Sequence, residues 1–270
     1  NYGYGINILA GASGNIVGGG TPETRNLISG NMLSGVNIQG SGTRNNVIQG
    51  NYIGTDTKGV IALGNNEFGV TIWSGANSNI IGGESPDTRN LISGNNGDGV
   101  RLSNGTSSNV IAGNYIGTDA NGKRRLPNIG EGVSVMTGAS SNIIGGEKTG
   151  ARNLISGNGT SGIIVSNVGT SDNKILGNYI GTDISGTDSL PNLSNGISVD
   201  SGASENTVGG GTVETRNLIS GNGRYGVFIF NQETSNNSIL GNFIGVDVNG
   251  SYSLGNNRGG IAIDSANQNT

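Results

Sequence analysis

A glycine followed by a β-branched residue and then by alternating apolar residues recurs nine times in this 270-residue chain. The glycines are Gly5, Gly35, Gly69, Gly99, Gly132, Gly162, Gly196, Gly226 and Gly260. Their spacings are 30, 34, 30, 33, 30, 34, 30 and 34, so a short unit of 30 residues alternates with a long unit of 33 or 34. A fixed period of this size is typical of solenoids, whose units pack only on their neighbours. We therefore expect a single elongated domain over residues 1–270.

Two columns of asparagine hold their places within these units. One stands 10 or 11 residues after each glycine, at Asn15, Asn46, Asn79, Asn109, Asn142, Asn173, Asn206 and Asn237. The other stands four residues before the next glycine, at Asn31, Asn65, Asn95, Asn128, Asn158, Asn192, Asn222 and Asn256. Stacked asparagines can hydrogen-bond along a ladder and satisfy polar groups at a bend. We expect both columns to be structural, with glycan binding as the alternative.

Each unit contains three short segments with strand-like alternation. In one short unit these are Gly69 to Ile72, Asn79 to Ile81 and Leu91 to Asn95, and in two long units the third segment is expected to end at Leu-Pro-Asn. Strands this short need parallel stacking on neighbours to bury their apolar side chains, and parallel crossovers are right-handed. The sequence predicts an all-β, right-handed parallel β-helix (a solenoid) of about eight coils, with three short strands per coil.

The repeated phrases Gly-Val-x-Ile and Gly50-Asn51-Tyr52-Ile53-Gly54-Thr55-Asp56 resemble the right-handed parallel β-helix repeat superfamily, whose fold is shared with pectate lyases. The second phrase recurs at residues 113–119, 177–183 and, with substitutions, 241–247. It is similar to repeats of large secreted or surface-displayed microbial proteins, and the resemblance implies an extracellular or cell-surface location. Because this fold hosts enzymes, adhesins and fibres alike, the resemblance specifies the fold more than the function.

Charge and composition argue against several classes of function. The net charge is −4 and Lys123-Arg124-Arg125 is the densest basic cluster, so binding to nucleic acid is not expected. No apolar stretch is long enough for a membrane helix. Cysteine and histidine are absent, which removes disulfides, thiolate metal sites and the most common general base. No cofactor is expected.

Arginine and aspartate alternate from one unit to the next, ten residues after the first asparagine column. The column is Arg25, Asp56, Arg89, Asp119, Arg152, Asp183, Arg216 and Asp247. Stacked in register, each aspartate would lie between two arginines, so the spacing predicts a structural salt-bridge ladder. The alternative is Ca²⁺ binding at Asp56, Asp119, Asp183 and Asp247, which the flanking arginines disfavour.

Few residues interrupt the repeat. Trp73, Met136, Phe228 and Phe230 are expected to point outward from the first strand and could contact a ligand or partner. No long turn predicts the wall of a cleft, no serine has a histidine to activate it, and no pair of carboxylates is evident at the separation that glycoside hydrolysis requires. We therefore expect no catalytic residues and no enzyme activity.

These observations favour a non-catalytic extracellular structural rod or surface fibre. The alternatives are a polysaccharide-binding adhesin module and a polysaccharide lyase or glycoside hydrolase. The terminal units carry no recognisable cap over their strand edges, so we expect the chain to be a fragment of a longer repeat array and to self-associate through its coil ends.

Overall fold

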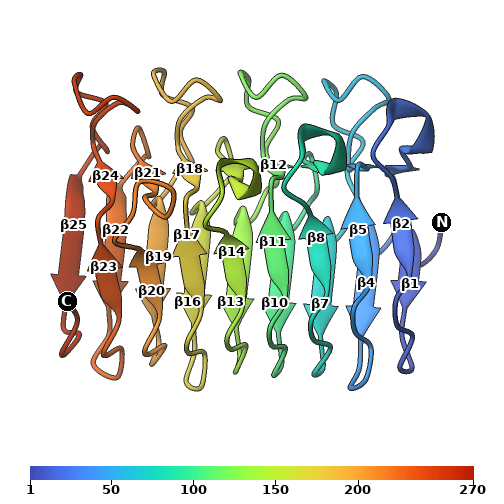
Figure 1. The fold of residues 1–270 in the computed structure, drawn as a ribbon, viewed down its shortest axis with the longest axis horizontal. Helices are drawn as coiled ribbons and strands as arrows, with labels where there is room; N and C mark the ends of the chain where they lie inside the picture. Colours follow the sequence, from blue (N-terminus) through green and yellow to red (C-terminus); the bar gives the residue numbers. More distant parts are fainter.

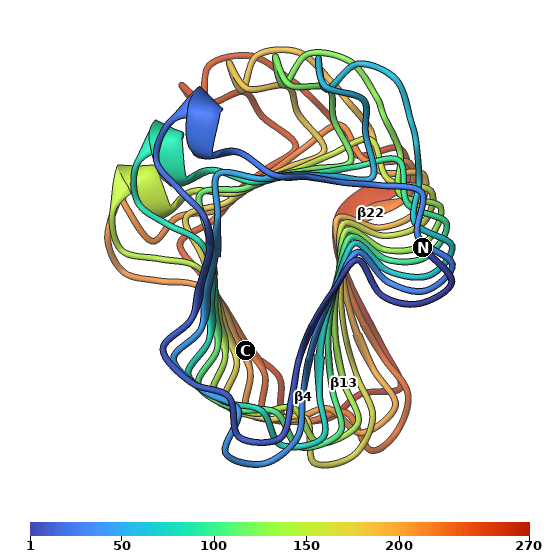
Figure 2. The same ribbon diagram turned by 90° about the vertical axis from the view of Figure 1, so that its right-hand side faces the viewer.

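The computed structural model describes residues 1–270 and is a right-handed parallel β-helix, with the two termini at opposite ends of the rod (Figure 1). Seen along the axis, the coils superpose and enclose a central core (Figure 2). Each coil gives one strand to each of three parallel sheets, so every strand pairs with its equivalents in the coils before and after it. The predicted fold class and three-stranded coil are confirmed. No helix has the length and hydrophobicity needed to span a bilayer.

The strands are short because each corner of the coil needs a turn. Sheet 1 contains β1 (Ile6–Ile8), β4 (Val36–Gln39), β7 (Val70–Trp73), β10 (Val100–Ser103), β13 (Val133–Met136), β16 (Ile163–Ser166), β19 (Ile197–Asp200), β22 (Tyr225–Phe230) and β25 (Gly259–Asp264). Sheet 2 contains β2 (Ile16–Gly18), β5 (Val47–Gln49), β8 (Ile80–Gly82), β11 (Val110–Ala112), β14 (Ile143–Gly145), β17 (Lys174–Leu176), β20 (Thr207–Gly209) and β23 (Ser238–Leu240). Sheet 3 contains β3 (Leu27–Ile28), β6 (Tyr52–Ile53), β9 (Leu91–Ile92), β12 (Tyr115–Ile116), β15 (Leu154–Ile155), β18 (Tyr179–Ile180), β21 (Leu218–Ile219) and β24 (Phe243–Ile244).

The core is a continuous column of isoleucine, valine and leucine from all three sheets. In β7, for example, Val70 and Ile72 are fully buried while Trp73 faces outward. Alternation of this kind is the expected period of a strand. In-register stacking then places like residues over one another, as where Val100 lies beside Val70 and Val133.

Three asparagine ladders fix the three corners. The two predicted columns are confirmed: Asn79, for example, donates to Oδ1 of Asn109 at 3.1 Å, and Asn95 donates to Oδ1 of Asn128 at 2.8 Å. The third ladder was not predicted, and it comprises Asn26, Asn51, Asn90, Asn114, Asn153, Asn178, Asn217 and Asn242. Buried amides that bond to each other and to backbone carbonyls satisfy the polar groups of each bend.

The two unit types carry their extra residues at different corners. In three of the short units the insertion precedes sheet 3 and forms a 3-10 helix: η1 (Pro22–Thr24), η2 (Pro86–Thr88) or η3 (Thr149–Ala151). In the long units it follows sheet 3, as a loop that packs over the outer face of that sheet (Figure 2). Leu-Pro-Asn therefore follows the loop and does not end a strand. The third strand of a long unit is the Tyr-Ile or Phe-Ile pair, as in β6.

Candidate functional site

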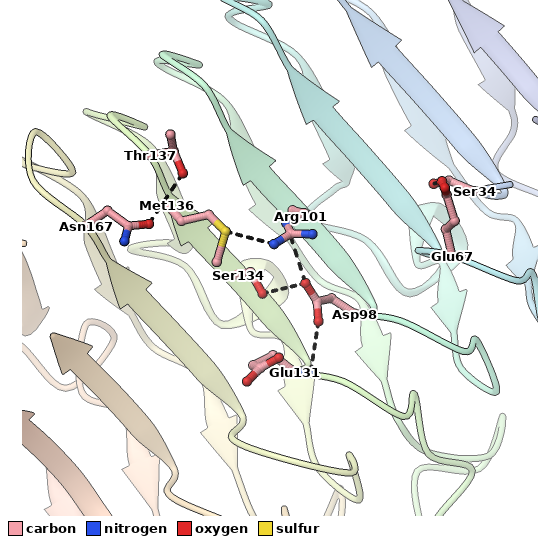
Figure 3. A network of polar contacts seen from close by, with 9 residues as sticks. All are labelled: Ser34, Glu67, Asp98, Arg101, Glu131, Ser134, Met136, Thr137 and Asn167. Atoms are coloured by element: carbon pink, nitrogen blue, oxygen red, sulfur yellow. Dashed lines mark hydrogen bonds and ion pairs between the residues drawn. The ribbon is translucent and has the colours of Figure 1, made fainter. Parts of the chain in front are cut away.

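The outer face of sheet 1 departs from the repeat where the chain enters β10 and β13. Most coils place a serine, asparagine or aromatic residue just before the strand, but here Asp98 and Glu131 occupy that position in consecutive coils. Arg101 points outward from β10, and Asp98 lies between it and Glu131 (Figure 3). These three charged residues lie on neighbouring strands because β10 and β13 pair in register. The sequence analysis missed them, although the clustering of charge in two consecutive units was a usable signal.

Two hydrogen-bond donors hold the Asp98 carboxyl group in place. Its Oδ2 accepts a hydrogen bond from the Ser134 hydroxyl at 2.7 Å, and its Oδ1 accepts one from the Glu131 backbone N–H at 3.1 Å. Gly130 makes this approach possible, since a Cβ on that residue would lie 2.3 Å from Oδ1 of Asp98. The Asp98 side chain is buried, at 9% exposure, and these contacts fix its position.

Glu131 lies next to Asp98, and its ionisation is perturbed. Burial raises the pKa of its carboxyl group, and the hydrogen bond and negative charge of Asp98 raise it further. Two adjacent carboxyl groups cannot both ionise without repulsion, so one of them retains a proton above the ordinary glutamate range. A carboxyl group whose pKa is raised by burial and by a neighbouring carboxylate is common in general acid–base catalysis.

Arg101 is held beside Asp98 by three contacts. Its Nε lies 3.9 Å from Oδ2 of Asp98, and its guanidinium carbon lies 4.6 Å from the centre of the Phe68 ring. One terminal nitrogen donates to the sulfur of Met136 at 2.9 Å. A thioether is a weak acceptor, so this guanidinium keeps most of its capacity to bind an anionic ligand.

The surface beside Arg101 is hollowed, with a volume of about 310 Å³. Tyr4, Glu67, Phe68, Trp73, Arg101 and Met136 are among the residues that line it. The Trp73 indole N–H donates to Oδ1 of Asn37 on the adjacent strand at 2.8 Å, which holds the ring against the sheet. Burial raises the pKa of Tyr4, and the charge of Glu67 adds to the effect. The hollow therefore combines aromatic surface with charge, as small-molecule and glycan sites do.

The predicted outward aromatic residues separate into two places. Trp73 and Met136 line the hollow, whereas Phe228 and Phe230 lie on β22, where their rings stack on each other at 4.5 Å. The four residues do face outward, but they do not form one surface.

The predicted Arg–Asp salt-bridge ladder is wrong. The structure contains two ion pairs, Arg101–Asp98 and Lys148–Glu84, and neither belongs to the column of Arg25, Asp56, Arg89, Asp119, Arg152, Asp183, Arg216 and Asp247. The reason is the register, because Leu27 pairs with Tyr52 and Arg25 therefore lies level with Gly50 and not with Asp56. In the short units the ten residues after the asparagine include the insertion that precedes sheet 3, whereas in the long units they include no insertion. The tenth residue therefore lies at a different place in the coil in the two unit types.

The aspartates of that column instead close their own loops. Asp56 accepts from the backbone N–H groups of Val60 and Ile61 at 2.8 and 3.0 Å, and these bonds lower the pKa of its carboxyl group. Asp119 accepts in the same way from Lys123 and Arg124. No group of three or more acidic side chains gathers in an arrangement suited to a metal ion.

The fold has solved relatives that are enzymes. The periplasmic alginate epimerase AlgG matches 91% of this chain and 49% of its own, with a TM-score of 0.58 and 18% identity. The A-module of the mannuronan C-5 epimerase AlgE6 of Azotobacter vinelandii matches 91% of this chain and 57% of its own, with a TM-score of 0.53 and 17% identity. The chain thus spans about half the length of the structures it matches. No protein-family model and no curated protein matches the sequence.

These similarities correct the expectation of a non-catalytic rod without enzyme activity. The solved structures found to be similar are alginate and mannuronan epimerases, and none of them is a fibre. Identities below 20% establish the fold alone, so the chemistry of this chain has to be argued from its own residues.

Proposed function

We propose that this chain is part of a polysaccharide-modifying enzyme that acts on a uronate-containing polymer at the Asp98–Arg101–Glu131 site. The observation that carries the proposal is the carboxyl pair, in which Asp98 is surrounded by donors and Glu131 has a raised pKa. Asp98 and Glu131 do not line the hollow, but Arg101, which contacts Asp98, does. A perturbed acidic group near a fixed cation is a general indicator of a catalytic site. Alginate, on which AlgG acts, is the first polymer to try.

Arg101 supplies the recognition of the uronate in this proposal. A guanidinium binds a carboxylate with two parallel hydrogen bonds, and binding withdraws electron density from the carboxyl group. The carbon next to that group then becomes a stronger acid. The Trp73 ring, held by Asn37, supports a neighbouring sugar through its apolar face.

The chemical step begins with proton transfer to Asp98. Its carboxylate removes the proton from the carbon next to the substrate carboxyl group, and the bonding electron pair moves into that group against Arg101. The electron pair then returns to form a carbon–carbon double bond, and the bond to the glycosidic oxygen breaks. Protonated Glu131 donates its proton to that oxygen, which leaves as an alcohol. This sequence is a β-elimination, with Asp98 as general base and Glu131 as general acid.

Epimerisation is the second candidate, favoured by the fold shared with AlgG and AlgE6. It begins with the same proton removal, but the proton returns to the opposite face of the carbon and no bond to oxygen breaks. The two outcomes give different products, unsaturated chain ends in one case and inverted sugars in the other. Since AlgG is periplasmic by its description, we place this chemistry outside the cytoplasm.

The test is incubation of the protein with mannuronan and alginate, with neutral mannan as the control polymer. Ultraviolet absorbance measures unsaturated ends and proton NMR measures inverted residues. We expect one of these products from the uronate polymers and none from mannan, with the rate falling about 10²–10⁴-fold in Asp98→Asn. An unchanged rate in folded Asp98→Asn, or no product from either uronate polymer, would overturn the proposal.

A further inference from the structure

Four arginines form a row along the edge of the rod where the chain enters sheet 3. They follow η1, η2, η3 and the equivalent turn of the seventh coil, and they are Arg25, Arg89, Arg152 and Arg216. They occur in every second coil, so their repeat along the rod is about 10 Å, twice the spacing between parallel strands. This edge lies beside the turns that contain the three short helices (Figure 1).

Each guanidinium group is held in the same orientation by two contacts. Its carbon lies 4.0–4.2 Å from the centre of an aromatic ring in the following coil, on Tyr52, Tyr115, Tyr179 or Phe243. Its Nε donates to the carbonyl of a glycine in that coil, at 3.1–3.4 Å. Stacking and one hydrogen bond therefore fix the plane of each group before any ligand arrives.

The terminal nitrogens of the four groups are left free. None of them takes part in an ion pair, and the only hydrogen bond of each guanidinium is the one from Nε. The side chains are exposed or half-buried, so these nitrogens are open to solvent. A fixed pair of terminal N–H donors matches the two oxygens of a carboxylate.

We propose that this row is a binding surface for a long anionic polysaccharide, separate from the site at Asp98. A uronate polymer lying along the rod would place carboxylates at regular intervals over the four guanidinium groups. Preorientation lowers the entropic cost of binding at each position, and repetition adds avidity. The class of polymer rests on the proposed function, whereas the surface itself does not.

One position in the row offers an internal comparison. An acidic residue stands two places before three of the arginines, at Glu23, Asp87 and Glu214, but Gly150 stands before Arg152. A nearby negative charge weakens the attraction of a guanidinium for an anion. Replacement of Arg152 should therefore weaken binding more than replacement of Arg25.

The experiment compares polymer binding by the intact chain and by variants with all four arginines changed to glutamine or to lysine. A control variant changes Lys58, Lys123, Arg124 and Arg44 to glutamine, which removes the same charge elsewhere. The probe is a mannuronan chain of about 20 sugars, measured by calorimetry in low salt, with neutral mannan and a DNA duplex as comparison polymers. Thermal melting of each variant checks that it remains folded.

We expect mannuronan to bind the glutamine variant at least roughly tenfold more weakly, with a smaller loss in the lysine variant and in the control. The Nε–H NMR signals of the four arginines in the unchanged protein should shift with mannuronan and not with mannan, which tests the surface without any substitution. Equal binding by the glutamine variant and the control, or equal affinity for DNA, would overturn the proposal.

The two proposals fail in distinguishable ways. Asp98→Asn should lower turnover about 10²–10⁴-fold and leave the binding of long mannuronan to the arginine row unchanged. The arginine variants should leave turnover of a short oligomer unchanged and weaken binding of the long one. If the arginine variants lose turnover of short and long oligomers equally, the row is not a separate surface.

Discussion

The backbone N–H of Glu131 donates to Oδ1 of Asp98 at 3.1 Å, which joins two carboxyl-bearing residues from consecutive coils in one site. Burial and this neighbour raise the pKa of Glu131. A group whose pKa is higher in the folded protein binds its proton more tightly there than in the unfolded chain. The raised pKa of Glu131 should therefore affect both the stability and the activity of the protein.

Stability should therefore fall as the pH rises from the ordinary glutamate range through the raised pKa of Glu131. Below the unfolded value both states hold the proton and no loss occurs, whereas above the folded value a buried charge opposes folding. Glu131→Gln should remove this part of the pH dependence, while Glu233→Gln, at an exposed position, should not. Urea denaturation across a pH series measures the effect. If the free energy of unfolding depended on pH in the same way in the wild type and in Glu131→Gln, the raised pKa of Glu131 would be contradicted.

Gly130 positions Asp98, and its replacement should move that carboxylate. A Cβ at residue 130 would lie 2.3 Å from Oδ1 of Asp98, whereas a Cβ at Gly255 would meet nothing within 4 Å. We expect Gly130→Ala to lower kcat about tenfold or more and to shift the pH profile of activity, since small displacements of catalytic groups are costly. Gly255→Ala is the matched control. Normal kcat in Gly130→Ala would show that the Asp98 position is unimportant.

In the third asparagine ladder, buried members should contribute more to stability than the exposed member at the end of the rod. Asn114 donates to Ile81, Ala112 and Asn153 and accepts from Asn90, all within the buried corner. Its replacement by alanine leaves several buried groups unpaired and should cost about 2–3 kcal/mol. Asn26→Ala, at the exposed end of the same ladder, should cost about 1 kcal/mol or less. Chemical denaturation separates the two, and equal losses would refute a cooperative ladder.

Asp119 should stabilise its loop without a metal ion. Its carboxylate accepts from the backbone N–H groups of Lys123 and Arg124 at 2.9 and 3.1 Å. Asp119→Ala should lower the free energy of unfolding by about 1–3 kcal/mol, the cost of leaving such donors unpaired. A chelator should leave the melting temperature of the wild type unchanged. A fall in that temperature on chelation would indicate calcium at the loops.

The fold could be predicted because it depends on a local period. Glycine, apolar alternation and two asparagine columns recur at almost constant distances, and each feature points to the same stacking. The third ladder could not be recognised in the sequence because insertions at different corners make its spacing uneven. Asn51 follows Asn26 by 25 residues, and Asn90 follows Asn51 by 39. The same unevenness produced the incorrect salt-bridge ladder.

The candidate site was harder to predict because it depends on register. Asp98 and Glu131 are 33 residues apart, and only the pairing of β10 with β13 brings them together. The chain also has no histidine and no long turn that would predict a cleft wall, so its sequence carries none of the usual signals of a catalytic site. The raised pKa of Glu131 arises from burial and from Asp98, and neither cause can be read from the sequence.

Solvent exchange tests the central claim most directly. If Asp98 removes the proton next to the uronate carboxyl group, mannuronan incubated with the protein in D₂O should gain deuterium at that carbon or lose the carbon-bound proton in an unsaturated product. Asp98→Asn and Glu131→Gln should each suppress the change seen by NMR. Unaltered mannuronan and alginate after prolonged incubation with folded wild-type protein, across the pH range in which Glu131 titrates, would contradict the account.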